Sequence, residues 1–247
     1  MNPASTFLQL LQAADPGAGE PSAAAVWGSL EAELRAGLAA YWESAGQVLA
    51  GSGIRLAAPG EETFDLRRNF FSALFLYAYW RAEVPPHRRV FYAAVNQCLR
   101  GMVTGCDNLL DDEYKATLET DLPPGGTRFR SVLDIMVSDR VLFQLLESLQ
   151  EAGEIGPQDA RRASAASLAA LAPSGAQEAG EERGVDRRLP PEQVLQEVHH
   201  LKTALLFQCT WALPAVLGDA GHPGVPALKD ALYDIGMGCQ VLDDMVD

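Results

Sequence analysis

Two short clusters of aspartates constrain this chain most, because each lies within an apolar run that has the spacing of a helix. In each cluster two aspartates stand four residues apart, Asp107 with Asp111 and Asp243 with Asp247. On a helix this spacing places both carboxyl groups on one face, one turn apart. Carboxylates on apolar helices need a compensating cation, and carboxylate oxygens suit Mg²⁺, which commonly binds substrate phosphates as well. The sequence therefore predicts a site in which Mg²⁺ joins the protein to a diphosphate.

The spacing of the apolar residues predicts an all-α fold, because no stretch of useful length alternates as a strand does. Residues 1–25 are predicted to form a flexible N-terminal arm, and residues 26–247 a single domain. The predicted helices cover residues 26–50, 64–82, 88–118, 129–152, 157–172 and 191–217, and a last helix begins near residue 226. Polar composition predicts a mobile loop over residues 173–188, and Pro214 predicts a kink near the end of the helix over 191–217.

Charge and composition exclude several classes of protein. The formal net charge of −14 is unsuited to binding nucleic acid or an anionic membrane, both of which attract basic surfaces. No uncharged apolar stretch reaches about 18 residues, so we expect no membrane span, and the amino terminus has no pattern of a secretory signal. The four cysteines lack the paired spacing of a metal site and are expected to be reduced core thiols, which predicts a cytoplasmic protein.

A third candidate element is Lys202-Thr203, which precedes an apolar run on a predicted helix. A lysine beside a hydroxyl can contact a diphosphate, but a lysine can also extend from an apolar helix into solvent. The acidic clusters have alternatives of the same kind, since the first can be a solvated helix face and the second a frayed chain end. The occurrence of all three elements in one chain, in a particular order, favours the functional interpretation.

In that order, the three elements resemble the motifs of the trans-isoprenyl diphosphate synthases, the polyprenyl synthetase family of the class I terpenoid synthase fold. The stretch from Asp107 to Asp111 resembles the family's DDxxD motif, with Asn108 in place of the second aspartate. Lys202-Thr203 resembles the family's KT pair, and residues 240–247 match QxxDDxxD closely. The resemblance extends from roughly residue 64 to the end of the chain.

This resemblance implies an all-α helical bundle around a deep central cavity, in most members a homodimer. It implies three Mg²⁺ ions, which bind an allylic prenyl diphosphate, and a carbocation that is attacked by the double bond of isopentenyl diphosphate. The implied catalysis is electrostatic stabilisation of the leaving diphosphate in a dry cavity, without a nucleophilic side chain.

The resemblance also implies roles for individual residues. The implied metal ligands are Asp107, Asp111, Asp243, Asp244 and Asp247, and the implied diphosphate-binding residues are Lys202, Thr203, Gln240, Arg100 and Arg68. Arg100 stands where the family usually has a histidine, seven residues before the first motif, and an arginine can also bind phosphate. Met102 and Val103 occupy the positions that gauge product length, and neither is an aromatic plug. A product longer than fifteen carbons is therefore not blocked there, although other residues can close the cavity lower down.

The chain departs from the family pattern where isopentenyl diphosphate binds. Arg68 is retained, but Asp65 stands at the position of a lysine and is expected to repel an anion. The family's arginine pair after the first motif falls at Ala116-Thr117. Arg128 and Arg130 can replace that pair or can lie solvated on the surface. The family's segment after the second motif is expected to be missing from this chain.

Three functions follow as hypotheses. The first is a Mg²⁺-dependent prenyltransferase that condenses an allylic prenyl diphosphate with isopentenyl diphosphate to a longer polyprenyl diphosphate. The second is a class I terpene synthase that ionises and cyclises a prenyl diphosphate, which the departures at Asp65 and Ala116-Thr117 favour. The third is a non-catalytic partner subunit of a heteromeric synthase, against which the aspartates retained in both motifs argue.

Overall fold

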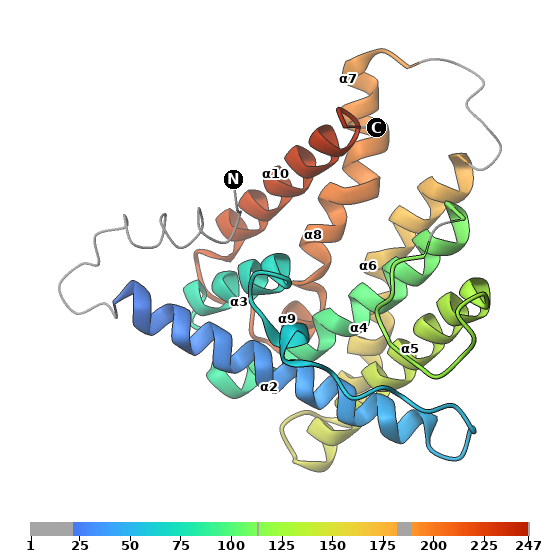
Figure 1. The fold of residues 1–247 in the computed structure, drawn as a ribbon. Coiled ribbons are helices and arrows are strands. Elements are labelled where there is room, and N and C mark those ends of the chain that lie inside the picture. The colour runs from blue at the N-terminus through green and yellow to red at the C-terminus, as the bar shows by residue number, and fades with distance from the viewer. Residues whose placement is uncertain (1–21, 113, 182–188, 247) are drawn as a thin grey trace.

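The computed structural model describes residues 22–112, 114–181 and 189–246. Within these ranges the regular elements are helices, and an isolated bridge joins Leu56 to Thr120 without forming a strand (Figure 1). The elements are α2 (Ala23–Leu49), η1 (Glu61–Phe64), α3 (Phe70–Arg81), α4 (Pro86–Leu110), α5 (Thr127–Glu151), α6 (Pro157–Glu181), α7 (Pro191–Gln193), η2 (Val194–Ala204), α8 (Leu205–Cys209), α9 (Ala212–Leu217) and α10 (Val225–Asp243). The predicted all-α class is confirmed. No helix in the described ranges is both long and apolar enough to cross a bilayer.

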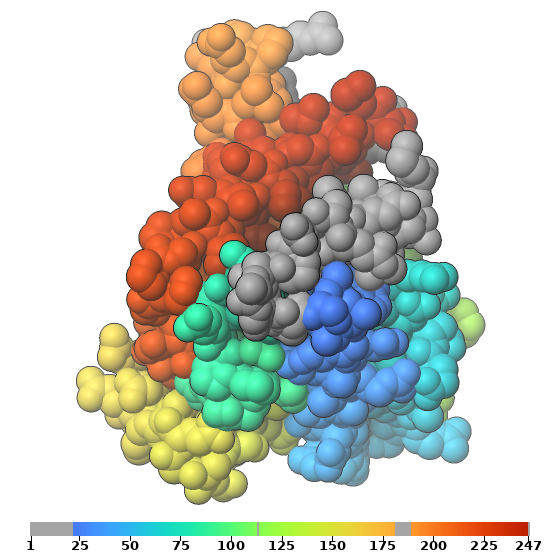
Figure 2. All heavy atoms as spheres, turned by 90° about the vertical axis from the view of Figure 1, so that its left-hand side faces the viewer, coloured from blue at the N-terminus to red at the C-terminus, as the bar shows by residue number. Residues whose placement is uncertain are grey.

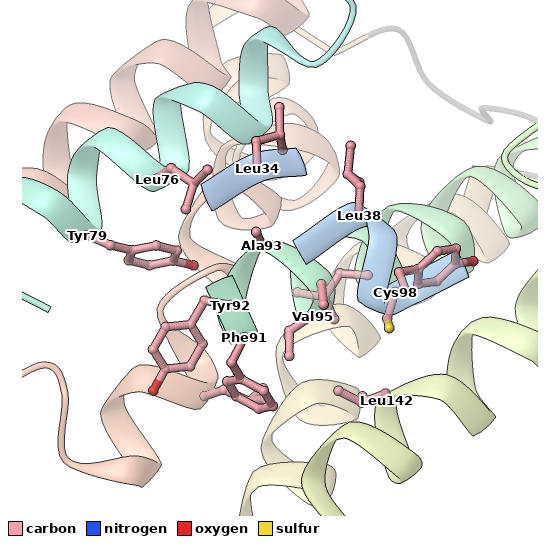
Figure 3. Packing of buried hydrophobic residues seen from close by; sticks show 14 of the residues in the cluster. Leu34, Leu38, Leu76, Tyr79, Phe91, Tyr92, Ala93, Val95, Cys98 and Leu142 are labelled. Atoms are coloured by element: carbon pink, nitrogen blue, oxygen red, sulfur yellow. The ribbon is translucent and has the colours of Figure 1, made fainter. Parts of the chain in front are cut away.

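The core is built around α4, against which α2, α3, α5 and α6 pack. Residues 91–99 of α4 are all buried, and Figure 3 shows five of their side chains, those of Phe91, Tyr92, Ala93, Val95 and Cys98, among side chains of α2, α3 and α5. The approach of α2 is so close that a Cβ atom on Gly37 would lie 2.5 Å from the Cβ of Ala93. Only a glycine fits there. Because residues 91–99 of α4 are enclosed by neighbouring helices, this part of α4 is a rigid support for the functional side chains that follow it on the same helix.

Two predicted helix boundaries were wrong because side chains outside the helix decide them. The predicted helix over 88–118 ends at Leu110, after which Asp112 adopts a left-handed conformation with φ of 53°. The predicted helix over 64–82 begins only at Phe70, because the Asp65 carboxylate accepts a hydrogen bond from the backbone N–H of Arg67 and stabilises a turn.

The prediction of a loop over residues 173–188 was wrong for its described part, since α6 continues through Pro173 to Glu181. Contacts with η2 favour this extension, because the Ser174 hydroxyl donates a hydrogen bond to the backbone carbonyl of Lys202. Residues 182–188 lie outside the described ranges.

The predicted single helix over 191–217 is divided. Its middle, η2, is an eleven-residue π-helix, a rare form that often marks functional sites. The helical structure is interrupted at residues 210–211, where the backbone carbonyl of Thr210 accepts a hydrogen bond from the Tyr79 hydroxyl. Pro214 lies within the first turn of α9, after this break. Figure 2 shows α10 on the surface, with α7 and the start of η2 projecting at one end of the molecule.

Candidate functional site

Two cavities of opposite character meet at one rim. The first, which we call the polar cavity, has a volume of about 330 Å³ and lies between α2, α4 and the segments 57–63 and 116–119. The second, which we call the apolar cavity, has a volume of about 410 Å³ and lies between α3, α4, α6 and α8. Arg68, Asn69 and Arg100 line both. Both volumes are in the range of small-molecule sites, roughly 300–1,000 Å³.

The cationic part of this rim is held in place by Asn69. The buried side chain of Asn69 donates hydrogen bonds to the backbone carbonyls of Thr63 (2.8 Å) and Asp65 (3.0 Å). Its amide oxygen accepts a hydrogen bond from Arg100 (3.2 Å). Arg100 as a whole is exposed at the rim, but desolvation of its guanidinium by the surrounding protein atoms lowers its pKa from the usual value. A partly desolvated guanidinium gains most from a bound anion, so the rim suits a phosphate group.

The polar cavity also contains an unsatisfied polar group. Gln97, which is only 3% exposed, lines this cavity from the central helix α4. Its side-chain oxygen has no hydrogen-bond partner in the described part of the chain. Buried amides are nearly always hydrogen-bonded, so this oxygen is suited to accept a hydrogen bond from a water molecule or a ligand.

The structure also places the departures from the family pattern. Asp65 is exposed, accepts a hydrogen bond from the backbone N–H of Arg67 and does not appear in the wall of either cavity. Ala116 and Thr117 do line the polar cavity, without supplying a positive charge. Glu62 and Glu119 add acidic groups to the same wall.

Neither of the two arginines expected as replacements for the family's pair, Arg128 and Arg130, lines this wall. Arg128 forms an exposed ion pair with Asp112 at 3.2 Å, and Arg130 donates a hydrogen bond to the backbone carbonyl of Thr120 at 3.0 Å. Arg130 also lies over the Tyr114 ring, 5.5 Å from its centroid. Both side chains therefore stabilise the connection between α4 and α5.

Thr117 has a buried partner that the sequence did not indicate. Its hydroxyl donates a hydrogen bond of 2.9 Å to the carboxylate of Asp134 on α5, which is 1% exposed. Burial raises the pKa of Asp134 to about 6. This pair holds one wall of the polar cavity against α5, and no motif or periodicity in the sequence distinguishes Asp134 from a solvated acid.

The first aspartate motif lies at the C-terminal end of α4. Asp107 is half-buried in the last turn, and Asp111 is exposed at the helix cap, where its backbone N–H bonds the carbonyl of Asp107 at 2.9 Å. Asn108, between them in the sequence, is 3% exposed, and its side chain bonds the loop that follows α4. Its amide donates to the backbone carbonyl of Lys115 at 3.0 Å and accepts from the N–H of Lys115 at 2.8 Å. Asn108 therefore fixes the loop after α4. Because Asn108 stands where the family has an aspartate, Asp107 and Asp111 are the two carboxylates that remain of the motif.

We expect Asn108→Asp, which would restore the family's motif, to impair the protein. A carboxylate can accept from the N–H of Lys115 but repels its carbonyl oxygen, and it places a charge in a buried position. An unsatisfied buried group of this kind costs about 1–3 kcal/mol of unfolding free energy, and more when charged. Urea denaturation measures the loss. Unchanged stability together with higher enzymatic activity would contradict this structural role for Asn108.

The second motif and the Lys202-Thr203 pair are joined in one hydrogen-bonded network. Thr203 donates to Gln240, and Gln240 donates to Asp244 at 2.9 Å. His199 on η2 bonds the other oxygen of Asp244 at 2.8 Å. Burial alone would raise the pKa of Asp244, but the hydrogen bonds from Gln240 and His199 outweigh it and lower that pKa. The π-helix thus holds the predicted diphosphate residues and the second motif in one unit.

The remaining predicted residues lie around this unit. The Lys202 ammonium forms an ion pair of 3.2 Å with Glu178, on the part of α6 that the sequence predicted as a loop. Asp243 is exposed at the end of α10, and Asp247 lies outside the described residues. In Figure 1 the C-terminal ends of α4 and α10 both lie in the upper half of the molecule.

The fit of these residues to Mg²⁺ is partial. All the predicted donors are carboxylates, the ligands that Mg²⁺ prefers. In residues 22–112, 114–181 and 189–246, however, no three histidine, cysteine or acidic side chains converge as a metal-binding group. A Mg²⁺ ion held by these carboxylates would therefore need further oxygen ligands, such as those of a phosphate group.

The two residues predicted to gauge product length line different cavities. Val103 lines the apolar cavity. Met102 lines a third cavity of about 620 Å³, which lies between α5 and α6.

Searches with this chain found no matching family model, no matching curated protein and no matching solved structure.

Proposed function

We propose that this protein is a Mg²⁺-dependent prenyltransferase that condenses an allylic prenyl diphosphate with isopentenyl diphosphate. The observation that carries the proposal is the junction of a polar and an apolar cavity at Arg68 and Arg100. A prenyl diphosphate has this same division, with an anionic head and an apolar tail. Burial of the tail contributes roughly 25 cal/mol per Å² of apolar surface, and the rim arginines bind the head.

In the proposed reaction the allylic C–O bond breaks, and diphosphate leaves with the electron pair. The double bond of isopentenyl diphosphate then forms the new C–C bond, and a proton is lost. Mg²⁺, when bound through Asp107, Asp111 and Asp243, supplies positive charge to the leaving group. Arg68 and Arg100 add hydrogen bonds to diphosphate, and the side chains of Phe75 and Phe207 keep water from the tail.

The wall of the polar cavity favours one alternative. Ala116 and Thr117 carry no charge, and Glu62 and Glu119 oppose a second diphosphate there. An enzyme that uses a single prenyl diphosphate would not need a second anion site. That enzyme would be a class I terpene synthase, which ionises and cyclises its substrate.

Incubation with labelled isopentenyl diphosphate and separate allylic donors, with Mg²⁺ or with a chelator, tests these functions. Mg²⁺-dependent elongated diphosphates support prenyl transfer. A hydrocarbon or alcohol formed from one donor alone supports the terpene synthase. No product from any donor contradicts both enzymes and leaves the non-catalytic partner subunit.

A pair of adjacent arginines provides a matched control for this assay. Arg68 lines both cavities, whereas its exposed neighbour Arg67 appears in the wall of neither. Loss of charged hydrogen bonds costs about 1.5–3 kcal/mol, so we expect Arg68→Ala to raise KM roughly ten- to a hundredfold. Arg67→Ala is expected to change little. Equal effects of the two variants would count against a diphosphate at the rim.

We also propose that the protein forms a homodimer through α5. Phe129, Met136 and Phe143 are exposed on this helix at intervals of seven residues, with Val132 between the first two. A twofold axis at Met136 would place Phe129 of one copy against Phe143 of the other, which is the self-complementarity of an isologous interface. Sedimentation equilibrium tests this, and a monomer at micromolar concentration would contradict it.

A further inference from the structure

The third cavity, of about 620 Å³, has no part in the site described so far. It lies between α5 and α6, and α4 contributes Met102 to it. Much of its wall is apolar and includes Met102, Phe143, Leu146, Ala160, Leu168 and Leu171, and Asp139, Glu147 and Arg161 add charged groups. Leu171 of α6 also lines the apolar cavity, so this side chain belongs to the walls of both.

The opposite side of the boundary is formed by α4. Met102 faces the third cavity and the next residue, Val103, faces the apolar cavity. Successive residues on a helix are rotated by about 100°, so the boundary between the two cavities follows this part of α4. Leu171 is half-buried and packs against the core. Leu171 of α6 thus lines both apolar spaces, at a place where α4 contributes a small side chain to one and a flexible side chain to the other.

The backbone of α6 is weakened beside this leucine. Pro173, two residues further along α6, has no N–H to bond the carbonyl of Ala169, and a proline inside a helix commonly bends it. The neighbouring carbonyl of Ala170 accepts a hydrogen bond from the Cys209 thiol of α8. The wall between the cavities is therefore at a position where α6 has lost one of its own hydrogen bonds.

We propose that Leu171 sets the length of the prenyl chain, by closing the apolar cavity against the third cavity. The proposal rests on the function proposed above. A diphosphate at Arg68 and Arg100 directs its tail into the apolar cavity, whose wall includes Val103 and Leu171. A tail that fills this space meets Leu171. Removal of that side chain gives the tail access to the third cavity, whose apolar wall can bury further isoprene units.

The test uses unreactive n-alkyl phosphates of increasing length, with binding measured by isothermal titration calorimetry. Each methylene buried in the cavity is expected to raise the affinity about fourfold, which corresponds to ~0.8 kcal/mol. In the wild-type protein this gain ends at the length at which the tail reaches Leu171. Leu171→Ala moves that limit to longer chains, and Leu171→Trp moves it to shorter ones.

Leu168 supplies the matched control, because it is exposed and lines only the third cavity. Leu168→Ala leaves the limit unchanged, whereas Leu168→Trp added to Leu171→Ala shortens the limit again. The proposal is overturned if the chain length at which the affinity stops rising is the same in the wild type and in both Leu171 variants. It is also overturned if the wild-type affinity keeps rising with every added methylene. The opposite shifts of the two variants exclude a general loss of folding as the cause.

The same variants separate this proposal from the proposed function. In the assay with labelled isopentenyl diphosphate, Leu171→Ala lengthens the longest product by at least one isoprene unit. A wild-type protein that shows no turnover, with a binding limit that still shifts, contradicts the prenyltransferase and supports the boundary at Leu171. Turnover with unchanged product length and an unchanged binding limit contradicts only the role of Leu171.

Discussion

Asp107→Ala is expected to lower turnover by about three orders of magnitude or more while the protein stays folded. Charge stabilisation by a bound metal contributes several kcal/mol to the transition state, and each 1.36 kcal/mol is a tenfold change in rate. Asp107 is the half-buried carboxylate of the first motif, so its loss removes the better protected of the two proposed ligands, Asp107 and Asp111. Steady-state kinetics with Mg²⁺ measures the effect.

Folding of this variant is expected to be unaffected for two reasons. A carboxylate in the last turn of a helix lies near the negative end of the helix dipole, so its removal is not destabilising. The loop that follows is held by Asn108 and Lys115, which the change does not touch. Circular dichroism and thermal unfolding check both points.

The matched control is Asp112→Asn. Asp112 is exposed, pairs with Arg128 and has φ of 53°, a conformation that asparagine tolerates well. This change removes a carboxylate close to Asp107 without altering the two predicted ligands of the motif. We expect nearly full activity. Wild-type turnover in Asp107→Ala, or an equal loss in both variants, would remove the assignment of Asp107 as a metal ligand.

The sequence predicted the helices well where apolar periodicity decides them, as in α2 and in the buried part of α4. It was wrong at boundaries that side-chain hydrogen bonds and ion pairs decide. The early end of α4 depends on Asn108 reaching Lys115, and the extension of α6 on Ser174 and Glu178 meeting Lys202. Neither contact follows from local propensity, because tertiary contacts override it.

The candidate site was predicted unevenly for a similar reason. Residue identities indicated that Arg68 and Arg100 belong together, and the structure places both at one rim. Identity alone did not indicate that the Asp65 carboxylate accepts a hydrogen bond from the backbone N–H of Arg67 and lines neither cavity. Gln97 and Asp134 were missed because nothing in the sequence distinguishes a buried polar group at a cavity from an ordinary polar residue.

The largest expected loss of stability comes from Glu33→Ala, at the junction of α2 with the first turn of α4. Arg89 donates to both oxygens of Glu33, and both side chains are less than a tenth exposed (8% and 9%). Arg89 also bonds the carbonyl of Val84 at 2.6 Å. Removal of one member of a buried pair leaves an uncompensated charge and costs about 3–5 kcal/mol. That is a large share of the 5–15 kcal/mol by which a domain is usually stable.

A second ion pair of α2 gives the comparison. Arg35 and Glu61 are as close, at 2.9 Å, but their side chains are 47% and 84% exposed. Exposed pairs contribute about 1 kcal/mol at most, so Glu61→Ala is expected to shift the urea midpoint only slightly. The double change Glu33→Met with Arg89→Met is expected to recover most of the stability lost in Glu33→Ala, because an apolar pair carries no buried charge. If Glu33→Ala proved as mild as Glu61→Ala, the buried pair could not be what fixes α4, and with it Arg100 and Asp107, against α2.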